Sequence, residues 1–448
     1  MASITSIPPE LLLDIITQAV ALTLQTQPLL IHGQFSQLSS SCRTCCFRQL
    51  ARVCKTWNEI VKEEFMGKEI VFGVFGSEKD EEVLSSVAKN EPKAEKVKKV
   101  DASLRCWQGW KTLPMVRSPT AAQEAEEEAS TGFLQTREAQ LEKERQQVLN
   151  RDRQRLFRLL AACRKIEDFD IDVGFYSSIP QTPTILPPTI RTLTLRNCDA
   201  QETFDLIGNL PLLEDLTLRL ALNWTVSAVS LPIAPKCRLR KFELSFTAFA
   251  SAKLDDLLLL LSSSTESLVS LTIRNKGTTH EGLRALLPIS AGLIQRFSSQ
   301  LEHLAIKDIP RAGTRSGDSQ PTWSWFPDQP TSYPQLRSLQ LTGMPSVDSD
   351  FFRSTLQLPS GTKKIERLII EDFDSPSPRR LVDALNKTRE LERLKLLEVA
   401  FRQREEGTEE AEKEIGEWCE GEGRGGKCRT ELRASWRMKK IDHYCGFW

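Results

Sequence analysis

The chain has 448 residues, of which 60 are basic and 60 acidic, so its formal net charge is zero. This balance disfavours a dedicated nucleic-acid-binding protein, and a composition of 40% hydrophobic and 27% charged residues excludes a wholly disordered chain. The 11 cysteines are irregularly spaced, which in a chain of this length favours free thiols in a reducing compartment. We therefore expect a globular protein of the cytoplasm, the nucleus or both.

The first 42 residues contain neither a signal peptide nor a membrane span by the usual sequence criteria. Pro8, Pro9, Glu10 and Asp14 interrupt the apolar stretch that a signal peptide needs. Residues 15–42 lack Asp, Glu, Lys and Arg but contain many Gln, Ser and Thr side chains, which a lipid-facing helix tolerates poorly. We expect neither secretion nor membrane insertion.

Residues 1–66 have the pattern of a small helical module. Prolines open the first predicted helix, and two stretches carry apolar residues that recur at helical spacing. These apolar residues are Leu12, Ile15 and Ile16 in the first stretch, and Val53, Trp57, Ile60 and Val61 in the second. So small a unit cannot bury all of them, so we expect some to contact a partner or the following domain.

The segments Pro9-Glu10-Leu11-Leu12 and Val53-Cys54-Lys55-Thr56-Trp57, with Ile15 or Ile16 after the first, resemble the F-box. The resemblance implies docking on the Skp-type adaptor of a cullin-RING ubiquitin ligase. The adaptor-binding residues that it implies are Pro8, Pro9, Leu11, Leu12, Ile15, Ile16, Val53 and Trp57. The two segments lie farther apart than in a compact F-box, so we expect an inserted loop near residues 25–46. A helical cap on the following array is the alternative.

Residues near 104–155 form a charged insertion in the first part of the second domain, which we place at 67–401. The stretch from Glu124 to Arg158 mixes both signs of charge among helix-forming residues. Its apolar residues are too sparse for a sustained coiled coil, so we expect a solvated helix or disorder.

An apolar-x-x-apolar-x-apolar segment recurs along the second domain, and from Ile166 onward successive segments start about 23 to 35 residues apart. The last two apolar residues of each segment alternate with polar ones, as in a half-buried strand, and apolar residues at helical spacing lie between segments. The segments are Val97/Val100/Ala102, Ile166/Phe169/Ile171, Ile190/Leu193/Leu195, Leu213/Leu216/Leu218, Leu239/Phe242/Leu244, Leu268/Leu271/Ile273, Leu301/Leu304/Ile306, Leu336/Leu339/Leu341, Ile365/Leu368/Ile370 and Leu391/Leu394/Leu396. One strand and one helix per repeat predict an α/β solenoid; a generic α/β domain is the alternative.

These repeats resemble the irregular leucine-rich repeats that follow the F-box in fungal-type F-box proteins. The resemblance implies parallel strands on a concave face and helices on a convex face. It departs from the family's strict form because the repeat length varies and only Asn197 lies near the usual asparagine position.

Residues 402–448 form a glycine-rich, charged stretch, which we expect to be a flexible tail. Its Gly421-Glu422-Gly423-Arg424-Gly425-Gly426 lacks the preceding strand and following helix of a phosphate-binding loop.

Catalytic and metal-binding patterns are weak in this sequence. Neither the cysteines at 42, 45 and 46 nor Cys419, Cys428, His443 and Cys445 have the paired short spacings of a zinc site. The four histidines are scattered, and neither a Walker P-loop nor a nucleophile elbow occurs. We expect no metal, no cofactor and no catalytic residue in the chain itself.

The residue after the third apolar position of each repeat is basic in several consecutive repeats. Arg196, Arg219, Arg274 and Lys307 are therefore candidate ligands for an acidic or phosphorylated client segment, because guanidinium groups bind carboxylates and phosphates in pairs. A charge-balanced, solvated face is the alternative. Trp323 and Trp325, in a long loop, are further candidate client anchors, or they cover the edge of the solenoid.

Together these patterns predict the client-recognition subunit of an SCF-type ubiquitin ligase, with residues 1–66 binding the adaptor and the repeats binding the client. The alternative is a repeat scaffold for protein interactions that acts without a ligase. A weaker alternative is an enzyme whose site lies in the variable loops.

Overall fold

The computed structural model describes residues 68–71, 82, 85–87, 89–102, 140, 143, 147, 154–172, 186–220, 223–226, 233–247, 251–276, 280–307, 333–342, 365–373, 396–401 and 413. The chain divides into two compact units, Met1–Leu193 and Thr194–Trp448. The predicted F-box-like module, nearly all of the predicted tail, and the tryptophans at 323 and 325 lie outside the described residues.

Among its described residues, the first unit contains three parallel strands, a short helix and helical residues 154–162. Its elements are β1 (Glu69–Val71), α5 (Glu91–Lys96), β2 (Lys99–Ala102) and β3 (Asp168–Asp172), with β2 between the other two strands. Helix α5 begins where the Asn90 side chain accepts a hydrogen bond from the backbone N–H of Lys93. Beneath the strands lie Val97, Val100, Phe169 and Ile171, all buried at the positions that the repeat pattern predicts.

The second unit is built on a longer parallel sheet. The strands that follow one another across it are β5 (Asp215–Leu220), β7 (Lys241–Thr247), β9 (Ser270–Lys276), β10 (His303–Lys307), β11 (Ser338–Thr342), β12 (Arg367–Phe373) and β13 (Leu396–Phe401). Strand β4 (Thr192–Arg196), within which the division between units falls, is next to β5. A small second sheet pairs β6 (Asn223–Trp224) with β8 (Ser251–Ala252).

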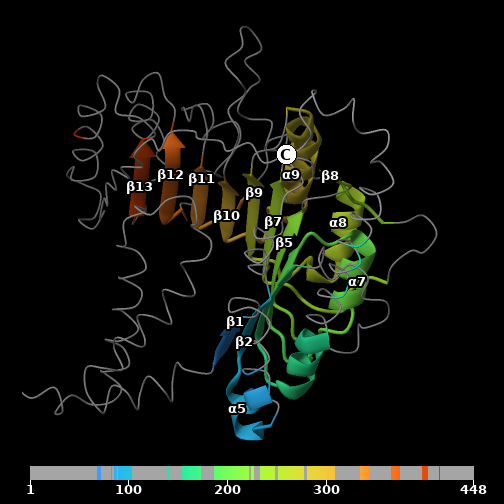
Figure 1. Ribbon diagram of the computed structural model, residues 1–448. Helices are drawn as coiled ribbons and strands as arrows, with labels where there is room; N and C mark the ends of the chain where they lie inside the picture. Colours follow the sequence, from blue (N-terminus) through green and yellow to red (C-terminus); the bar gives the residue numbers. More distant parts are fainter. Residues whose placement is uncertain are drawn as a thin grey trace, which may run out of the picture. The chain divides into compact units, whose positions relative to one another are not determined.

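Helices connect the first strands of this unit. They are α7 (Ala200–Ile207), α8 (Leu254–Leu260) and α9 (His280–Phe297), with a 3₁₀ turn over Ser262–Ser264, and in Figure 1 they lie on the same side of the strands. Helix α7 has a capping box, in which the Asp199 side chain accepts from the N–H of Glu202 and the Glu202 side chain accepts from the N–H of Asp199. Helices α8 and α9 approach closely where Gly292 of α9 meets Leu254 of α8, because a Cβ at residue 292 would lie 2.3 Å from the Leu254 Cδ2.

Alternation along the strands defines two faces of the second unit's sheet. In β5 the leucines at 216, 218 and 220 are buried while Asp215, Thr217 and Arg219 are half-buried, and β10 and β11 show the same alternation over most of their length. Residues of the helices, such as Leu257, Leu286 and Phe297, are buried as well, and in Figure 1 the helices lie on one side of the strands. The opposite side chains therefore form an open face. The prediction of an α/β fold with parallel strands and intervening helices is confirmed.

Two buried aromatic residues lie where α7 meets the small sheet. Trp224 is completely buried, its ring stacks on that of Phe204 at 6.2 Å between centroids, and its Nε1–H donates to the Thr203 Oγ1 at 3.1 Å. The Thr203 hydroxyl donates in turn to the carbonyl of Asp199 at 2.7 Å. Because the buried indole N–H has an acceptor, the helix and the small sheet are joined without an unsatisfied polar group.

A pair of backbone hydrogen bonds recurs at the start of the strands. The carbonyl directly before one strand accepts from two consecutive N–H groups of the next repeat, as Arg240 does from Val269 and Ser270. The carbonyls that accept in this way belong to Lys68, Lys98, Glu167, Glu214, Arg240, Val269, Glu302 and Arg337. Consecutive repeats are therefore joined at the same point on each strand, which is the regularity that a solenoid requires.

The last predicted repeat is displaced along the sequence. Strand β13 begins at Leu396, and its register pairs Leu397 with Leu368 and Val399 with Ile370. The prediction that Leu394 and Leu396 occupy these positions is therefore wrong by three residues. The run from Leu391 to Val399 is rich in apolar residues, so the pattern alone fits more than one register there.

Candidate binding surface

The open face of the second unit carries its side chains in rows that run across the strands. Strand register aligns Arg219 with Ser245, Ser245 with Arg274, and Arg274 with Lys307. Because adjacent strands lie about 4.8 Å apart, the backbones of neighbouring row members are separated by that distance, and those of Arg219 and Arg274 by roughly 10 Å. The register thus brings three of the sequence-predicted residues, Arg219, Arg274 and Lys307, together along one line.

We call Arg196, Arg219, Arg274 and Lys307 the basic row. All four residues are half-buried, and each lies at or near the carboxyl end of its strand. Arg196 follows Leu195 of β4 as Arg219 follows Leu218 of β5. Ser245, between two of the arginines, is only 1% exposed. Farther across the sheet the register continues through Thr342 to Glu371 and Ala400, so the row is basic only over its first strands. Leu397, which directly follows the last apolar residue of the predicted final repeat, does not lie in this row, because Ala400 is aligned with Glu371.

One member of the basic row has a carboxylate beside it. The Arg274 Nη1 lies 3.6 Å from the Glu243 Oε1, and both side chains are about one quarter exposed, at 25% and 29%. Glu243 lies in the neighbouring strand, two residues before Ser245, which is aligned with Arg274. The alternative of a charge-balanced face therefore applies in part to Arg274, which has Glu243 nearby. On the strand at its other side, however, Arg274 is aligned with Lys307, a residue of the same charge.

The starts of the strands carry a different charge pattern. We call Glu214, Arg240, Glu302, Arg337 and Glu366 the entry ladder; each directly precedes a strand, and their signs alternate, with the uncharged Val269 before β9 between Arg240 and Glu302. Arg337 and Glu302 are 4.0 Å apart, and one position farther along the strands Lys241 and Asp215 form an ion pair of 2.8 Å. At this edge of the sheet the charges of neighbouring repeats compensate one another.

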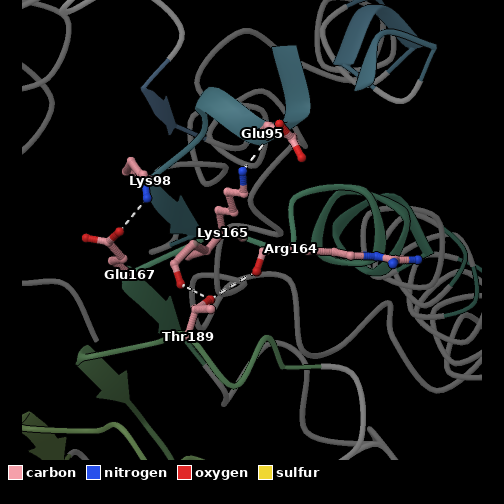
Figure 2. A network of polar contacts seen from close by, with 7 residues as sticks. Glu95, Lys98, Arg164, Lys165, Glu167 and Thr189 are labelled. Carbon is pink, nitrogen blue, oxygen red and sulfur yellow. Dashed lines mark hydrogen bonds and ion pairs between the residues drawn. The ribbon is translucent and has the colours of Figure 1, made fainter. Parts of the chain in front are cut away.

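The first unit shows the same compensation at the start of its strands (Figure 2). Lys98 pairs with Glu167, Lys99 with Asp168 at 3.2 Å, and Lys165 with Glu95 at 3.3 Å. The Thr189 hydroxyl reaches two carbonyls, at 3.0 Å from that of Arg164 and 2.7 Å from that of Ile166. Sequence reasoning missed these alternating charges, although the residue after the first apolar position of each repeat carries the signal.

The described cysteines are not candidates for nucleophiles or for redox-sensitive groups. Burial raises the pKa of the Cys163 and Cys237 thiols to about 11, and that of Cys198 to about 12. Their thiols stay protonated at neutral pH, and the thiolate is the reactive form. Among the described residues no group of His, Cys, Asp and Glu side chains has the arrangement of a metal site.

Three observations complete the description. Within the described ranges, no helix combines the length and the apolar character needed to cross a membrane. Large exposed apolar side chains in the described part of the chain are Leu212 and Ile233, at 47% and 85% exposure. Comparison with known proteins shows that the sequence matches no family model and no curated protein.

Proposed function

We propose that the chain is the client-recognition subunit of an SCF-type ubiquitin ligase. In this proposal the F-box-like residues of the first 66 positions bind a Skp-type adaptor held by a cullin. The repeats form a leucine-rich-repeat solenoid, with the parallel strands on its concave face and the helices on its convex face. The client binds the concave face, and the complex acts in the cytoplasm, the nucleus or both.

The observation that carries the proposal is the row of like charges on an otherwise regular parallel sheet. Like charges opposite one another on neighbouring strands destabilise a sheet, so sheet stability alone does not account for Arg274 beside Lys307. A row of guanidinium and ammonium groups suits carboxylates or phosphates, with which arginine forms bidentate hydrogen bonds. The basic row thus supports an acidic or phosphorylated client segment.

In this proposal the chain holds no catalytic group. It contributes proximity, because a client bound to the repeats is held near the ubiquitin-loaded enzyme at high effective concentration. Charged side chains on the open face steer the client and fix its position more than they raise its affinity.

The proposal is tested by recovering the adaptor and the cullin with the intact protein from cells. Replacement of Pro9, Leu12 and Trp57 by Ala should abolish their recovery, while Arg219→Glu with Lys307→Glu should leave it unchanged. If the intact protein recovers neither adaptor nor cullin, the ligase proposal fails and the repeats are a scaffold without a ligase. Enrichment of bound proteins with the proteasome inhibited then identifies the client.

A further inference from the structure

The chain contains its own acidic segment directly after the last strand. Residues 405–422 include nine glutamates and one lysine, which gives this segment a net charge of minus eight. The glutamates are Glu405, Glu406, Glu409, Glu410, Glu412, Glu414, Glu417, Glu420 and Glu422. Since the whole chain is neutral, this segment is one of the strongest concentrations of charge in the sequence.

Strand direction brings the start of this segment to the edge of the sheet that holds the basic row. All strands of the sheet are parallel, so their carboxyl ends lie at the same edge. Phe401 ends β13 at that edge, and Lys307 and Arg219 lie at or near it on β10 and β5. Only residues 402–404 separate the last strand from the first glutamate.

The segment is long enough to reach every aligned member of the row. From β13 the register leads across β12 and β11 to β10, about 14 Å away, and across six intervals to β5, about 29 Å away. The 21 residues from Arg402 to Glu422 span up to roughly 70 Å when extended. Lys413, the described residue of this segment, is helical and exposed, and even a wholly helical segment of this length spans about 32 Å.

We propose that residues 405–422 lie along the basic row, with their glutamates bound to Arg219, Arg274 and Lys307, and that an acidic client must displace them. The client part of this inference rests on the proposed function. The order of charges fits the row, because Arg402 and Arg404 come first, where the row carries Glu371, and the glutamates follow, where it is basic.

Such an arrangement regulates by competition. Single exposed ion pairs contribute little, about 0 to 1 kcal/mol, so the bound state depends on several pairs together and weakens with salt. A covalently joined segment is present at an effective concentration in the millimolar range, which suffices to occupy a weak site. A client that binds the same row must therefore bind tightly enough, or be concentrated enough, to displace the segment.

Zero-length cross-linking tests the contact directly. A water-soluble carbodiimide joins lysine amines to carboxylates that touch them, and peptides that link Lys307 to a glutamate of 405–422 are expected by mass spectrometry. The pair Lys241 and Asp215, 2.8 Å apart, is the internal positive control. A mixture of isotope-labelled and unlabelled protein separates links within one chain from links between chains. If the control pair is linked and Lys307 is not linked to the segment within one chain, the inference is wrong.

Competition is tested on the full chain with a fluorescent polyglutamate peptide as the probe. Changing the nine glutamates of 405–422 to Gln should tighten probe binding at least about tenfold, and adding Arg219→Glu and Lys307→Glu should remove that gain. A control outside the segment changes the four glutamates Glu124, Glu126, Glu127 and Glu128 to Gln, and its probe affinity should equal that of the unmodified chain. If the variant with nine Gln residues binds the probe no more tightly than the unmodified chain, the inference is wrong. If the intact protein fails to recover the adaptor from cells, only the ligase proposal is wrong.

Discussion

In the second unit, the charges on neighbouring strands are arranged differently at the amino and the carboxyl ends of the strands. At the start of the strands the entry ladder alternates in sign, and pairs such as Lys241 with Asp215 lie within 2.8 Å. At the opposite end Arg274 and Lys307 stand beside each other with the same sign. The first arrangement pairs opposite charges on neighbouring strands, whereas the second places like charges next to each other. Under the proposed function, the amino edge serves the stability of the array and the carboxyl edge serves recognition of the client.

The largest expected effect is on binding at the carboxyl edge. Arg219→Glu together with Lys307→Glu should weaken capture of an acidic probe at least about tenfold, because each reversal removes an ion pair worth about 0 to 1 kcal/mol and adds a repulsion of similar size. Fluorescence anisotropy with a polyglutamate peptide, in the background in which 405–422 carries Gln, measures the change.

The matched control reverses two charges at the other edge, Lys241→Glu and Arg337→Glu. Its affinity for the same probe should change less than about threefold, because these residues lie at the opposite ends of the strands. If both double variants lose the same affinity, the net charge of the protein governs binding and the distinction between the two edges is lost.

A second effect, a loss of stability, is expected from a change in the buried interior between the two edges. The buried Ser264 hydroxyl oxygen accepts from the backbone N–H of Leu239 at 2.9 Å, and Ser264 is 1% exposed. Ser264→Ala leaves that N–H without its acceptor and should lower the free energy of unfolding by about 1 to 3 kcal/mol. Urea denaturation measures the loss, and Ser262→Ala, at the exposed start of the same turn, is the control.

A smaller effect is expected from the charges of the amino edge. Lys241→Asp places a second carboxylate beside that of Asp215, and this repulsion should lower the free energy of unfolding by about 0.5 to 1 kcal/mol. Adding Asp215→Lys restores opposite charges and should recover most of the loss. A double-mutant cycle that shows no coupling between these two positions would contradict the compensating role of this edge.

The smallest expected effect runs in the opposite direction. In the background in which 405–422 carries Gln, Lys307→Gln removes a positive charge that lies opposite Arg274 and should raise the free energy of unfolding by a few tenths of a kcal/mol. Low-salt thermal denaturation detects it best, and the gain should vanish at high ionic strength because screening removes the repulsion. A lower stability of this variant at low salt would mean that the row is compensated in the folded chain.

The strands could be predicted because burial imposes a two-residue period that the sequence displays directly. Leu193, Leu195, Leu216 and Leu218 are all at most 1% exposed at the predicted positions. The same logic failed at β13, where the apolar residues from Leu391 to Val399 fit several registers. Hydrogen bonding to β12 selects one of them, and that pairing is not a property of the segment alone.

For the candidate site, too, the sequence predicts some features and not others. The alignment of Arg219, Arg274 and Lys307 follows from the repeat pattern, since equivalent positions of stacked repeats form rows. The ion pair of Arg274 with Glu243 depends on which rotamers meet across two strands, and no spacing rule identifies it. The small sheet of β6 and β8 was likewise not predicted, because two-residue strands have no period to detect.

The paired backbone hydrogen bonds at the strand starts bear on how this protein tolerates changes in length. The Lys98 carbonyl accepts from Glu167 and Asp168 across a separation of about 69 residues, in the same way as the Arg240 carbonyl accepts from Val269 and Ser270 across about 29. The same pair of backbone hydrogen bonds therefore forms whatever the length of the chain between the two strands. Insertions between these points leave the register of the sheet intact, so connecting segments are free to acquire or lose sequence during evolution while the rows of side chains on the open face keep their alignment.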